Sequence, residues 1–288
     1  MKLITYASKG NAPQIGAIHN NRIINLHQAS GGELPGNMRD FLELGDSGMA
    51  AAQDAIANAT GGESLDSVKL MSPIGNPSKI VAIGLNYMDH VRESGIPVPE
   101  VAIMFCKFPN SIIGPGDDIC WSKEITQKVD YEAELAIVIG RTARNVTEAD
   151  AFDYIAGYTN CNDVSARDLQ FDKGDQWIRG KSLDTFCPLG PWLVTRDEIP
   201  DPHNLSIKSI LNGKVMQNSN TRELIFKIPF LIKYLSEAFT LLPGDVIATG
   251  TPSGVGAFRK PPIWMKHGDT ISIEVDGLGQ LSNPCVEL

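Results

Sequence analysis

Two glutamates, Glu132 and Glu134, lie two positions apart in the apolar segment VDYEAELAIVIG, residues 129–140. In a β-strand, residues two apart point to the same face, so both carboxylates would project from one side of a buried element. Two like charges on a desolvated face need a compensating charge. An isolated Glu-x-Glu pair is more often solvated or paired with Lys or Arg, so this pattern alone leaves both interpretations open.

A third carboxylate, Asp163, lies near the end of a second apolar-rich segment, GYTNCNDVSARD, residues 157–168. If the two segments are neighbouring strands, Glu132, Glu134 and Asp163 form a compact site made only of oxygen ligands. Such ligands favour Mg²⁺ or Mn²⁺ over zinc, with Ca²⁺ a less favoured choice. A divalent cation would also remove the repulsion between the two glutamates.

The segment GLNYMDHVRESG places His90 and Glu93 three residues apart, on one face of an expected short helix. Asn86 is a candidate N-cap and Gly95 a candidate helix end. A histidine oriented by a carboxylate can take a proton from water near neutral pH. The alternative is a surface pair that stabilises the helix by a few tenths of a kcal/mol. The glycine- and proline-rich surroundings would suit a mobile lid.

Two further segments carry residues that could bind an anion. Lys181, in WIRGKSLDTFCPLGP, is a candidate to contact an oxyanion or a substrate carboxylate, although it could also be a solvated lysine. The glycine-rich segment TGTPSGVGAFR, residues 249–259, directly follows an expected strand. Its backbone N–H groups and the Thr251 hydroxyl could bind a carboxylate.

The composition limits the classes of partner. The chain has 288 residues, of which 42% are hydrophobic, so it can bury a sizeable core. Its formal net charge of -9 argues against a nucleic-acid or anionic-membrane footprint, which would require clustered Lys and Arg. The five cysteines form no C-x-x-C pair, and no apolar run approaches the ~20 residues that span a bilayer. We therefore expect a soluble, cytoplasmic protein.

The order of elements predicts two domains. In residues 1–72, an antiparallel meander with a turn at Asn20 and Asn21 precedes helices near 38–44 and 49–58. The Pro/Gly/Ser-rich link SPIGNPSK then marks a boundary. Strands dominate residues 73–288, interrupted by helices over 148–156 and 222–239, the second kinked at Pro229. The pattern predicts a mixed α+β fold, mainly β, and disfavours a doubly wound nucleotide fold.

Five segments together resemble the fumarylacetoacetate hydrolase (FAH) superfamily, and they occur in that family's order. They are GLNYMDHVRE, DYEAELAIVIG, GYTNCNDVSARDLQ, WIRGKSLDTFCPLGP and GDVIATGTPSGVG. The resemblance implies an FAH-type β-roll catalytic domain over residues 73–288. It also implies that residues 1–72 are the small N-terminal α+β domain of the longer bacterial members. It further implies a homodimer, Mg²⁺ or Mn²⁺ at the mouth of the fold, and a small 2-oxo or 2,4-dioxo acid as substrate.

The resemblance also assigns roles to residues. The metal ligands would be Glu132, Glu134 and Asp163, the dyad His90 and Glu93, and the oxyanion contact Lys181; the substrate contacts would be Arg167, Gln170, Gly250 and Thr251. An additional aspartate ligand of the founding hydrolase has no counterpart that we can locate in this chain. The chain therefore resembles the acylpyruvase-like branch.

These roles imply hydrolysis of a C–C bond in a 2,4-dioxo acid, such as an acylpyruvate or fumarylpyruvate. His90 would deprotonate water, which attacks the distal carbonyl, while Lys181 stabilises the oxyanion; the products are pyruvate and a carboxylic acid. One alternative is decarboxylation of oxaloacetate or a similar β-keto acid on the same site. Isomerase or hydratase chemistry on a 2-oxo acid is another, and a non-catalytic oxo-acid-binding protein is a third. Specificity is expected in residues 94–105 and 171–177.

Overall fold

The computed structural model describes residues 1–8, 10, 12–172 and 176–288, and is built on a large β-sheet. Neighbouring strands in this sheet follow the order β4 (Glu63–Ser64), β3 (Arg22–Asn25), β2 (Gln14–His19), β1 (Lys2–Ser8), β14 (Cys187–Thr195), β12 (Ile155–Asn162), β11 (Ala133–Ile139), β17 (Val246–Ala248), β6 (Ile80–Gly84) and β7 (Ile103–Lys107). Two strands lie off this path: β5 (Val68–Met71) pairs with β1, and β8 (Ile112–Ile113) with β14. The pairs are antiparallel except β17 with β6 and β14 with β8.

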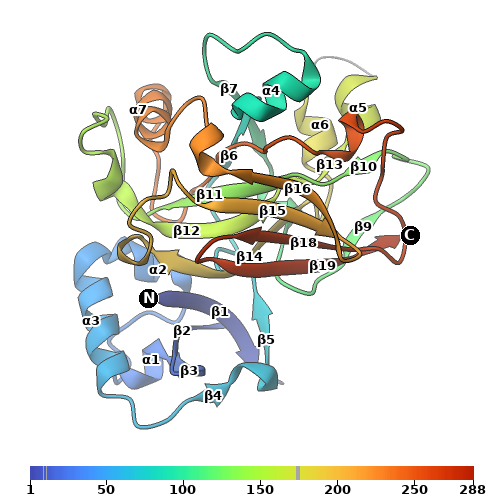
Figure 1. The fold of residues 1–288 in the computed structure, drawn as a ribbon. Coiled ribbons are helices and arrows are strands. Elements are labelled where there is room, and N and C mark those ends of the chain that lie inside the picture. Colours follow the sequence, from blue (N-terminus) through green and yellow to red (C-terminus); the bar gives the residue numbers. More distant parts are fainter. Residues whose placement is uncertain (9, 11, 173–175) are drawn as a thin grey trace.

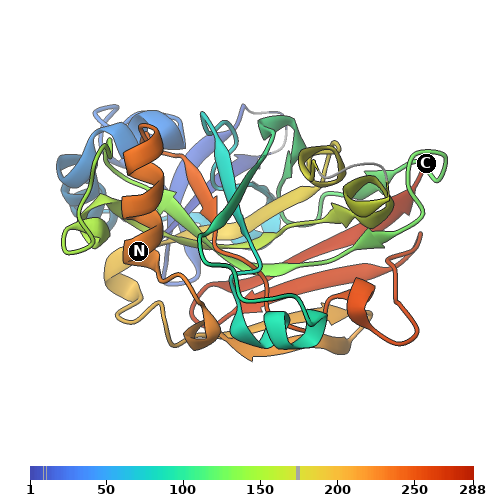
Figure 2. The same cartoon turned by 90° about the horizontal axis from the view of Figure 1, so that it is seen from above.

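A second sheet packs against the middle of the first (Figure 1). Its strands follow the order β16 (Lys214–Asn220), β15 (Ser206–Leu211), β18 (Thr270–Val275), β19 (Gly279–Glu287) and β9 (Ile119–Trp121). The turn between β15 and β16 has positive φ at both Asn212 and Gly213, the geometry that two-residue hairpins prefer. Figure 2 shows the orange and red strands of this sheet as a separate layer beside the green strands of the first.

Strand β11 is buried on both faces, which explains the apolar run that encloses the two glutamates. Leu135 and Ile137 belong to the core between the two sheets, together with Ile273 of β18. Ala136 and Val138 point to the opposite face, into a second apolar cluster. The sequence of a strand covered on both sides is continuously hydrophobic and does not alternate between apolar and polar residues.

Short helices surround the sheets. They are α1 (Leu26–Ala29), α2 (Met38–Glu43), α3 (Gly45–Ala57), α4 (Met88–Ser94), α5 (Arg167–Phe171), α6 (Ile178–Lys181) and α7 (Ile228–Ala238). The 3₁₀ turns are η1 (Leu65–Ser67), η2 (Pro109–Ser111), η3 (Ala151–Tyr154), η4 (Arg196–Glu198), η5 (Thr221–Glu223) and η6 (Gly256–Phe258). Within the described residues, none of these helices combines the length and apolar character that crossing a membrane requires. Figure 1 shows α4, α5 and α6 at one end of the molecule.

The mixed, mainly β fold predicted from the sequence is confirmed, and three local predictions need correction. Pro229 lies in the first turn of α7 and does not kink it, because N–H groups there have no intrahelical partner. The helix expected over 148–156 is only the 3₁₀ turn η3. Asn86 does not cap α4: its side chain donates to the carbonyl of Thr249 and accepts from the N–H of Phe226.

The N-terminal strands continue the main sheet. Leu3 of β1 lies opposite Leu193 of β14, and β5 pairs with the later residues of β1 along the same edge, while β2 pairs with the other edge. The turn at Asn20 and Asn21 between β2 and β3 has positive φ at both residues. The boundary at residue 72 directly follows β5, and a division into domains 1–72 and 73–288 stays a prediction.

Candidate active site

Three carboxylates meet where β11 and β12 end. Antiparallel pairing puts Glu134 opposite Cys161, so Asp163, just beyond β12, lies beside Glu132, just before β11. One oxygen of Glu132, of Glu134 and of Asp163 lies within 4.8 Å of the other two. All three side chains are buried, so the glutamates do not face solvent, whereas the alternative of pairing with Lys or Arg holds for Glu132.

Three cations surround this carboxylate cluster. Lys181 Nζ lies 2.8 Å from Glu132 Oε2 and 2.8 Å from Asp163 Oδ2. Arg167 Nη2 lies 2.7 Å from the second oxygen of Glu132. Lys107 Nζ donates to the second oxygen of Asp163 at 2.6 Å and to the backbone carbonyls of Val164 and Lys181. Both lysines are buried, which requires such pairing.

The charges are distributed unevenly among the carboxylates. Burial alone would raise the pKa of Glu132, but Lys181 and Arg167 lower it to about 2. The pKa of Glu134 is raised well above its usual value by burial and by the neighbouring Asp163 and Glu132. Glu134 accepts a hydrogen bond from the N–H of Gly250, at 2.9 Å. A buried carboxylate of this kind, beside two others, matches what a hard divalent cation needs, and the cluster could hold Mg²⁺ or Mn²⁺.

Lys107 is not among the residues that the sequence predicts for this site. Its only signal is a lysine inside the apolar segment AIMFCKF, residues 102–108. The side chain of Lys107 points inward from β7, an edge strand of the main sheet. Burial lowers the pKa of Lys107, but Asp163 outweighs this and raises it. Lys107 therefore stays charged and fixes the Asp163 oxygen that Lys181 does not contact.

Replacing Lys107 with Met should destabilise the protein. The change leaves one buried oxygen of Asp163 without its charged donor, and losing one partner of a buried pair costs about 3–5 kcal/mol. Denaturant unfolding should show this loss in the free energy of unfolding, and Mn²⁺ should recover part of it, because the ion would bind the folded cluster and not the unfolded chain. Lys123, whose side chain is largely exposed beside Glu287, provides the control: Lys123→Met should cost under about 1 kcal/mol. An equally small cost for Lys107→Met would show that Lys107 does not hold Asp163.

Helix α4 carries His90 and Glu93 over the cluster. His90 Nδ1 lies 3.3 Å from Glu93 Oε2, so the structure forms the predicted dyad contact. His90 is buried and lies edge-on to the ring of Phe258, 5.5 Å away. Glu93 also accepts hydrogen bonds from the N–H of Gly254 at 2.9 and 3.0 Å. The left-handed Gly95, with φ of 68°, ends the helix.

The predicted substrate contacts line the same region, and most are already hydrogen-bonded. Arg167 donates to Asp130 and to Gln170, each at 2.9 Å. The Thr251 hydroxyl donates to the carbonyl of Ala133 and accepts from Gln217. Roles for Arg167, Gln170, Gly250 and Thr251 in binding substrate stay predictions.

Asp130 is a second residue without a clear signal in the sequence. It is fully buried and accepts hydrogen bonds from the N–H groups of Gly256 and Ala257, at 2.7 and 3.0 Å. It also pairs with Arg167. Asp130 thus fixes both Arg167 and the loop that carries Phe258.

A cavity of about 50 Å³ connects these groups. Its polar lining includes Glu132, Glu134, Lys181 and Thr251, and its aromatic lining includes Phe105, Phe171 and Trp177. His90 and Phe258 lie on its wall. Such a space suits a small anionic molecule that presents oxygen atoms to a cation and a proton to His90.

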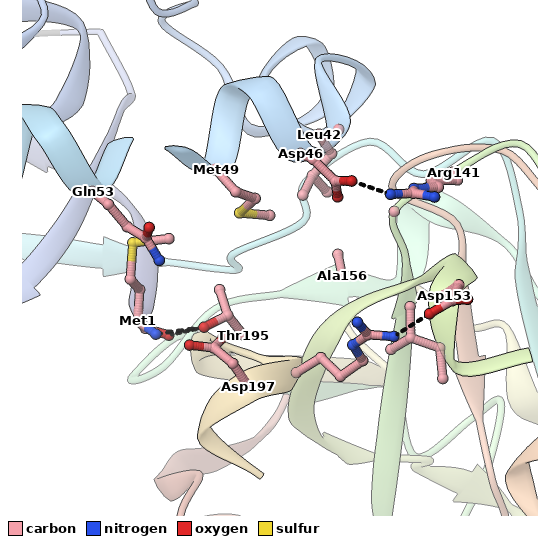
Figure 3. A pocket seen from close by; sticks show the side chains of 14 residues that line it. Met1, Leu42, Asp46, Met49, Gln53, Arg141, Asp153, Ala156, Thr195 and Asp197 are labelled. Carbon is pink, nitrogen blue, oxygen red and sulfur yellow. Dashed lines mark hydrogen bonds and ion pairs between the residues drawn. The ribbon is translucent and has the colours of Figure 1, made fainter. Parts of the chain in front are cut away.

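A second hollow, of about 170 Å³, lies between α3 and η4 (Figure 3). It is lined by Met49 from the N-terminal part and by Arg141 and Arg196 from the remainder of the chain. Arg141 pairs with Asp46, and Arg196 with Asp153 at 3.0 Å. Because both arginines are already paired, we assign the chemistry to the carboxylate cluster and not to this hollow.

Comparison with known proteins identifies the family. Residues 79–286 match the fumarylacetoacetate (FAA) hydrolase C-terminal domain. The chain belongs to the fumarylacetoacetate hydrolase family of enzymes, as the sequence motifs predict.

The relatives carry different activities in their names. The chain is 49% identical to oxaloacetate tautomerase fahd2, mitochondrial, from Xenopus laevis, over 99% of this chain and 90% of the relative. It resembles the structure of 5-carboxymethyl-2-hydroxymuconate delta-isomerase from Mycobacterium smegmatis, with TM-score 0.79, 38% identity and coverage of 100% and 99%. It also resembles maleylpyruvate hydrolase from Sphingobium sp. SYK-6, with TM-score 0.83, 30% identity and coverage of 100% of both chains.

The expectation of a cytoplasmic protein is contradicted by these comparisons. The Xenopus laevis relative, which is 49% identical to this chain, is named mitochondrial. Composition and cysteine spacing do not distinguish one cellular compartment from another.

Proposed function

We propose that this protein interconverts the keto and enol forms of oxaloacetate or a closely similar 2-oxo acid. The observation that carries the proposal is the position of His90, paired with Glu93 and facing the cavity beside three buried carboxylates. The name of the Xenopus laevis relative supports this chemistry. Among the activities considered above, it favours the oxaloacetate and isomerase alternatives over C–C hydrolysis of an acylpyruvate.

Tautomerisation moves one proton and breaks no C–C bond. Glu132, Glu134 and Asp163 would hold Mg²⁺ or Mn²⁺, which when bound supplies a Lewis acid that polarises the 2-oxo group. His90 takes a proton from C3 of the keto form, and Glu93 stabilises the resulting imidazolium. Lys181 faces the C2 oxygen and stabilises the negative charge that develops there. The imidazolium then gives this proton to the enolate oxygen, which yields the enol and neutral His90, and the reverse sequence regenerates the keto form.

C–C hydrolysis of a 2,4-dioxo acid is the second candidate. It would use the same dyad to deprotonate water, and the likeness to maleylpyruvate hydrolase supports it. Decarboxylation of oxaloacetate would use the same cluster without a base. For each candidate we propose a homodimer, which follows from the family resemblance.

Proton NMR in D₂O separates the candidates. The purified protein is given oxaloacetate or acetylpyruvate, each with Mg²⁺ and with excess chelator. We expect the C3 protons of oxaloacetate to exchange with deuterium faster than with Mg²⁺ alone, without formation of pyruvate. Pyruvate from oxaloacetate above the Mg²⁺ background would indicate a decarboxylase instead. Acetate plus pyruvate from acetylpyruvate would indicate the hydrolase.

A further inference from the structure

Three aromatic side chains that line the cavity, Phe105, Phe171 and Trp177, pack together as an aromatic wall. The ring of Trp177 lies 5.5 Å from that of Phe105 at an interplanar angle of 68°, and 6.4 Å from that of Phe171 at 82°. Both are edge-to-face arrangements, which aromatic pairs prefer. Trp177 thus joins the two phenylalanines into one surface.

Gly84 makes room for the indole ring. A Cβ at this position, at the end of β6, would lie 2.5 Å from Cζ3 and 3.1 Å from Cη2 of Trp177. Gly84 is not among the residues with positive φ, so it is the close approach of the ring that favours glycine here. The wall is therefore built from three segments of the chain: β6, β7 and the region around α5 and α6.

The wall stands close to the reacting groups. Trp177 precedes α6 with helical φ and ψ, and Lys181 ends the same helix four residues later. Residues four apart lie on one face of a helix, so the two side chains leave the backbone about one helical turn apart, with Cβ atoms separated by ~6 Å. Lys181 Nζ also lies 5.2 Å from the ring centre of Phe105.

We infer that Trp177 sets the length limit of the substrate. A 2-oxo acid whose head group contacts the carboxylate cluster meets the indole after a few carbon atoms, so the site takes short 2-oxo acids and excludes longer chains. This inference rests on the proposed function for the chemistry of the head group. It adds the size class of the substrate and the residue that determines it.

Calorimetric titration of the Mn²⁺-loaded protein with 2-oxobutanoate and 2-oxooctanoate tests this inference without turnover. The wild-type protein should bind 2-oxobutanoate at least about tenfold more tightly, because extra methylenes in a closed pocket change affinity by ~10–200-fold. In Trp177→Ala this preference should fall by about tenfold or reverse. Trp177→Leu, which keeps an apolar side chain, should lie between.

Trp192 offers the matched control. It is half-buried on β14, against Gly279, and does not line the cavity. Trp192→Ala should leave the ratio of the two Kd values unchanged. An unchanged ratio in Trp177→Ala, or an equal change in Trp192→Ala, would overturn the inference. So would loss of 2-oxobutanoate binding in both Trp177 variants, because Trp177 would then hold the site itself.

The outcomes also separate this inference from the proposed function. In one outcome the wild-type protein prefers 2-oxobutanoate, and Trp177→Ala loses this preference, without any C3 exchange of oxaloacetate. That result would support the length limit and reject tautomerisation. C3 exchange by the wild-type protein, with the preference for 2-oxobutanoate unchanged in Trp177→Ala, would support tautomerisation and reject the length limit.

Discussion

Glu134→Gln is expected to stabilise the metal-free protein while abolishing its binding of divalent cations. The pKa of Glu134 is raised by burial and by Asp163 and Glu132, so its charged form is disfavoured in the folded state. Below the pKa of an unfolded glutamate, near 4.3, Glu134 is protonated in both the folded and the unfolded state, so it costs no folding stability. As the pH rises, the unfolded chain releases this proton first, and folding stability falls. Glutamine removes this loss and can still accept the hydrogen bond from Gly250.

The gain in the free energy of unfolding from Glu134→Gln should therefore grow as the pH rises above the pKa of an unfolded glutamate. Each unit of upward pKa shift corresponds to about 1.4 kcal/mol, so we expect Glu134→Gln to raise the free energy of unfolding by at least roughly 1–2 kcal/mol at pH 8 with chelator present. Mn²⁺ affinity should fall by at least about 100-fold, since even outer-shell partners of metal ligands contribute ~10–100-fold. Activity that depends on the cation should disappear with it.

Glu132→Gln is the matched comparison, with the opposite sign for stability. Lys181 and Arg167 lower the pKa of Glu132 to about 2, so its charge stabilises the fold above the pKa of an unfolded glutamate and this contribution is lost only as the pH falls toward 2. Removing that charge takes one of two carboxylate partners from both Lys181 and Arg167, and should cost roughly 3 kcal/mol at pH 8. Cation affinity should fall in this variant too. If both variants changed stability in the same direction, the uneven charge distribution described above would be wrong.

The sequence predicts the parts of this site that depend on local periodicity. The spacing of Glu132 and Glu134 predicts that their carboxylates project together, and the structure shows this although Glu132 lies one residue before β11. The spacing of His90 and Glu93 places both on one face of a helix, as the structure shows. The order of five motifs was enough to identify the family, because several ordered motifs are more specific than any one alone.

Other parts of the site depend on contacts between distant segments, which the sequence does not reveal. Lys107 meets Asp163 only because β7 folds to the edge of the main sheet near α6. Asp130 binds Gly256 across a separation of 126 residues. Trp177 lies in residues 171–177, one of the two segments expected to carry specificity, but its packing on Gly84 requires the fold. Residues 173–175 of that segment lie outside the described part of the chain.

A large catalytic effect that leaves the carboxylate cluster unchanged is expected for His90→Gln. If His90 carries the proton from C3, its loss should slow C3 exchange of oxaloacetate by about 10²–10⁴-fold, the usual contribution of a general base. The affinity for 2-oxobutanoate should stay within about threefold, because the carboxylate cluster and the aromatic wall are unchanged. Glutamine can still donate a hydrogen bond to Glu93, so α4 should remain in place.

This variant also distinguishes the three chemistries. Decarboxylation needs no base, so any decarboxylase activity should persist in His90→Gln, whereas hydrolysis should fall as steeply as C3 exchange. His267→Gln, at an exposed histidine outside the cavity, is the control and should leave every rate unchanged. C3 exchange in His90→Gln within threefold of the wild-type rate would remove His90 from the mechanism. Equal loss of exchange and decarboxylation would instead mean that His90 supports binding at the cluster, since only a shared step could slow reactions with such different proton requirements.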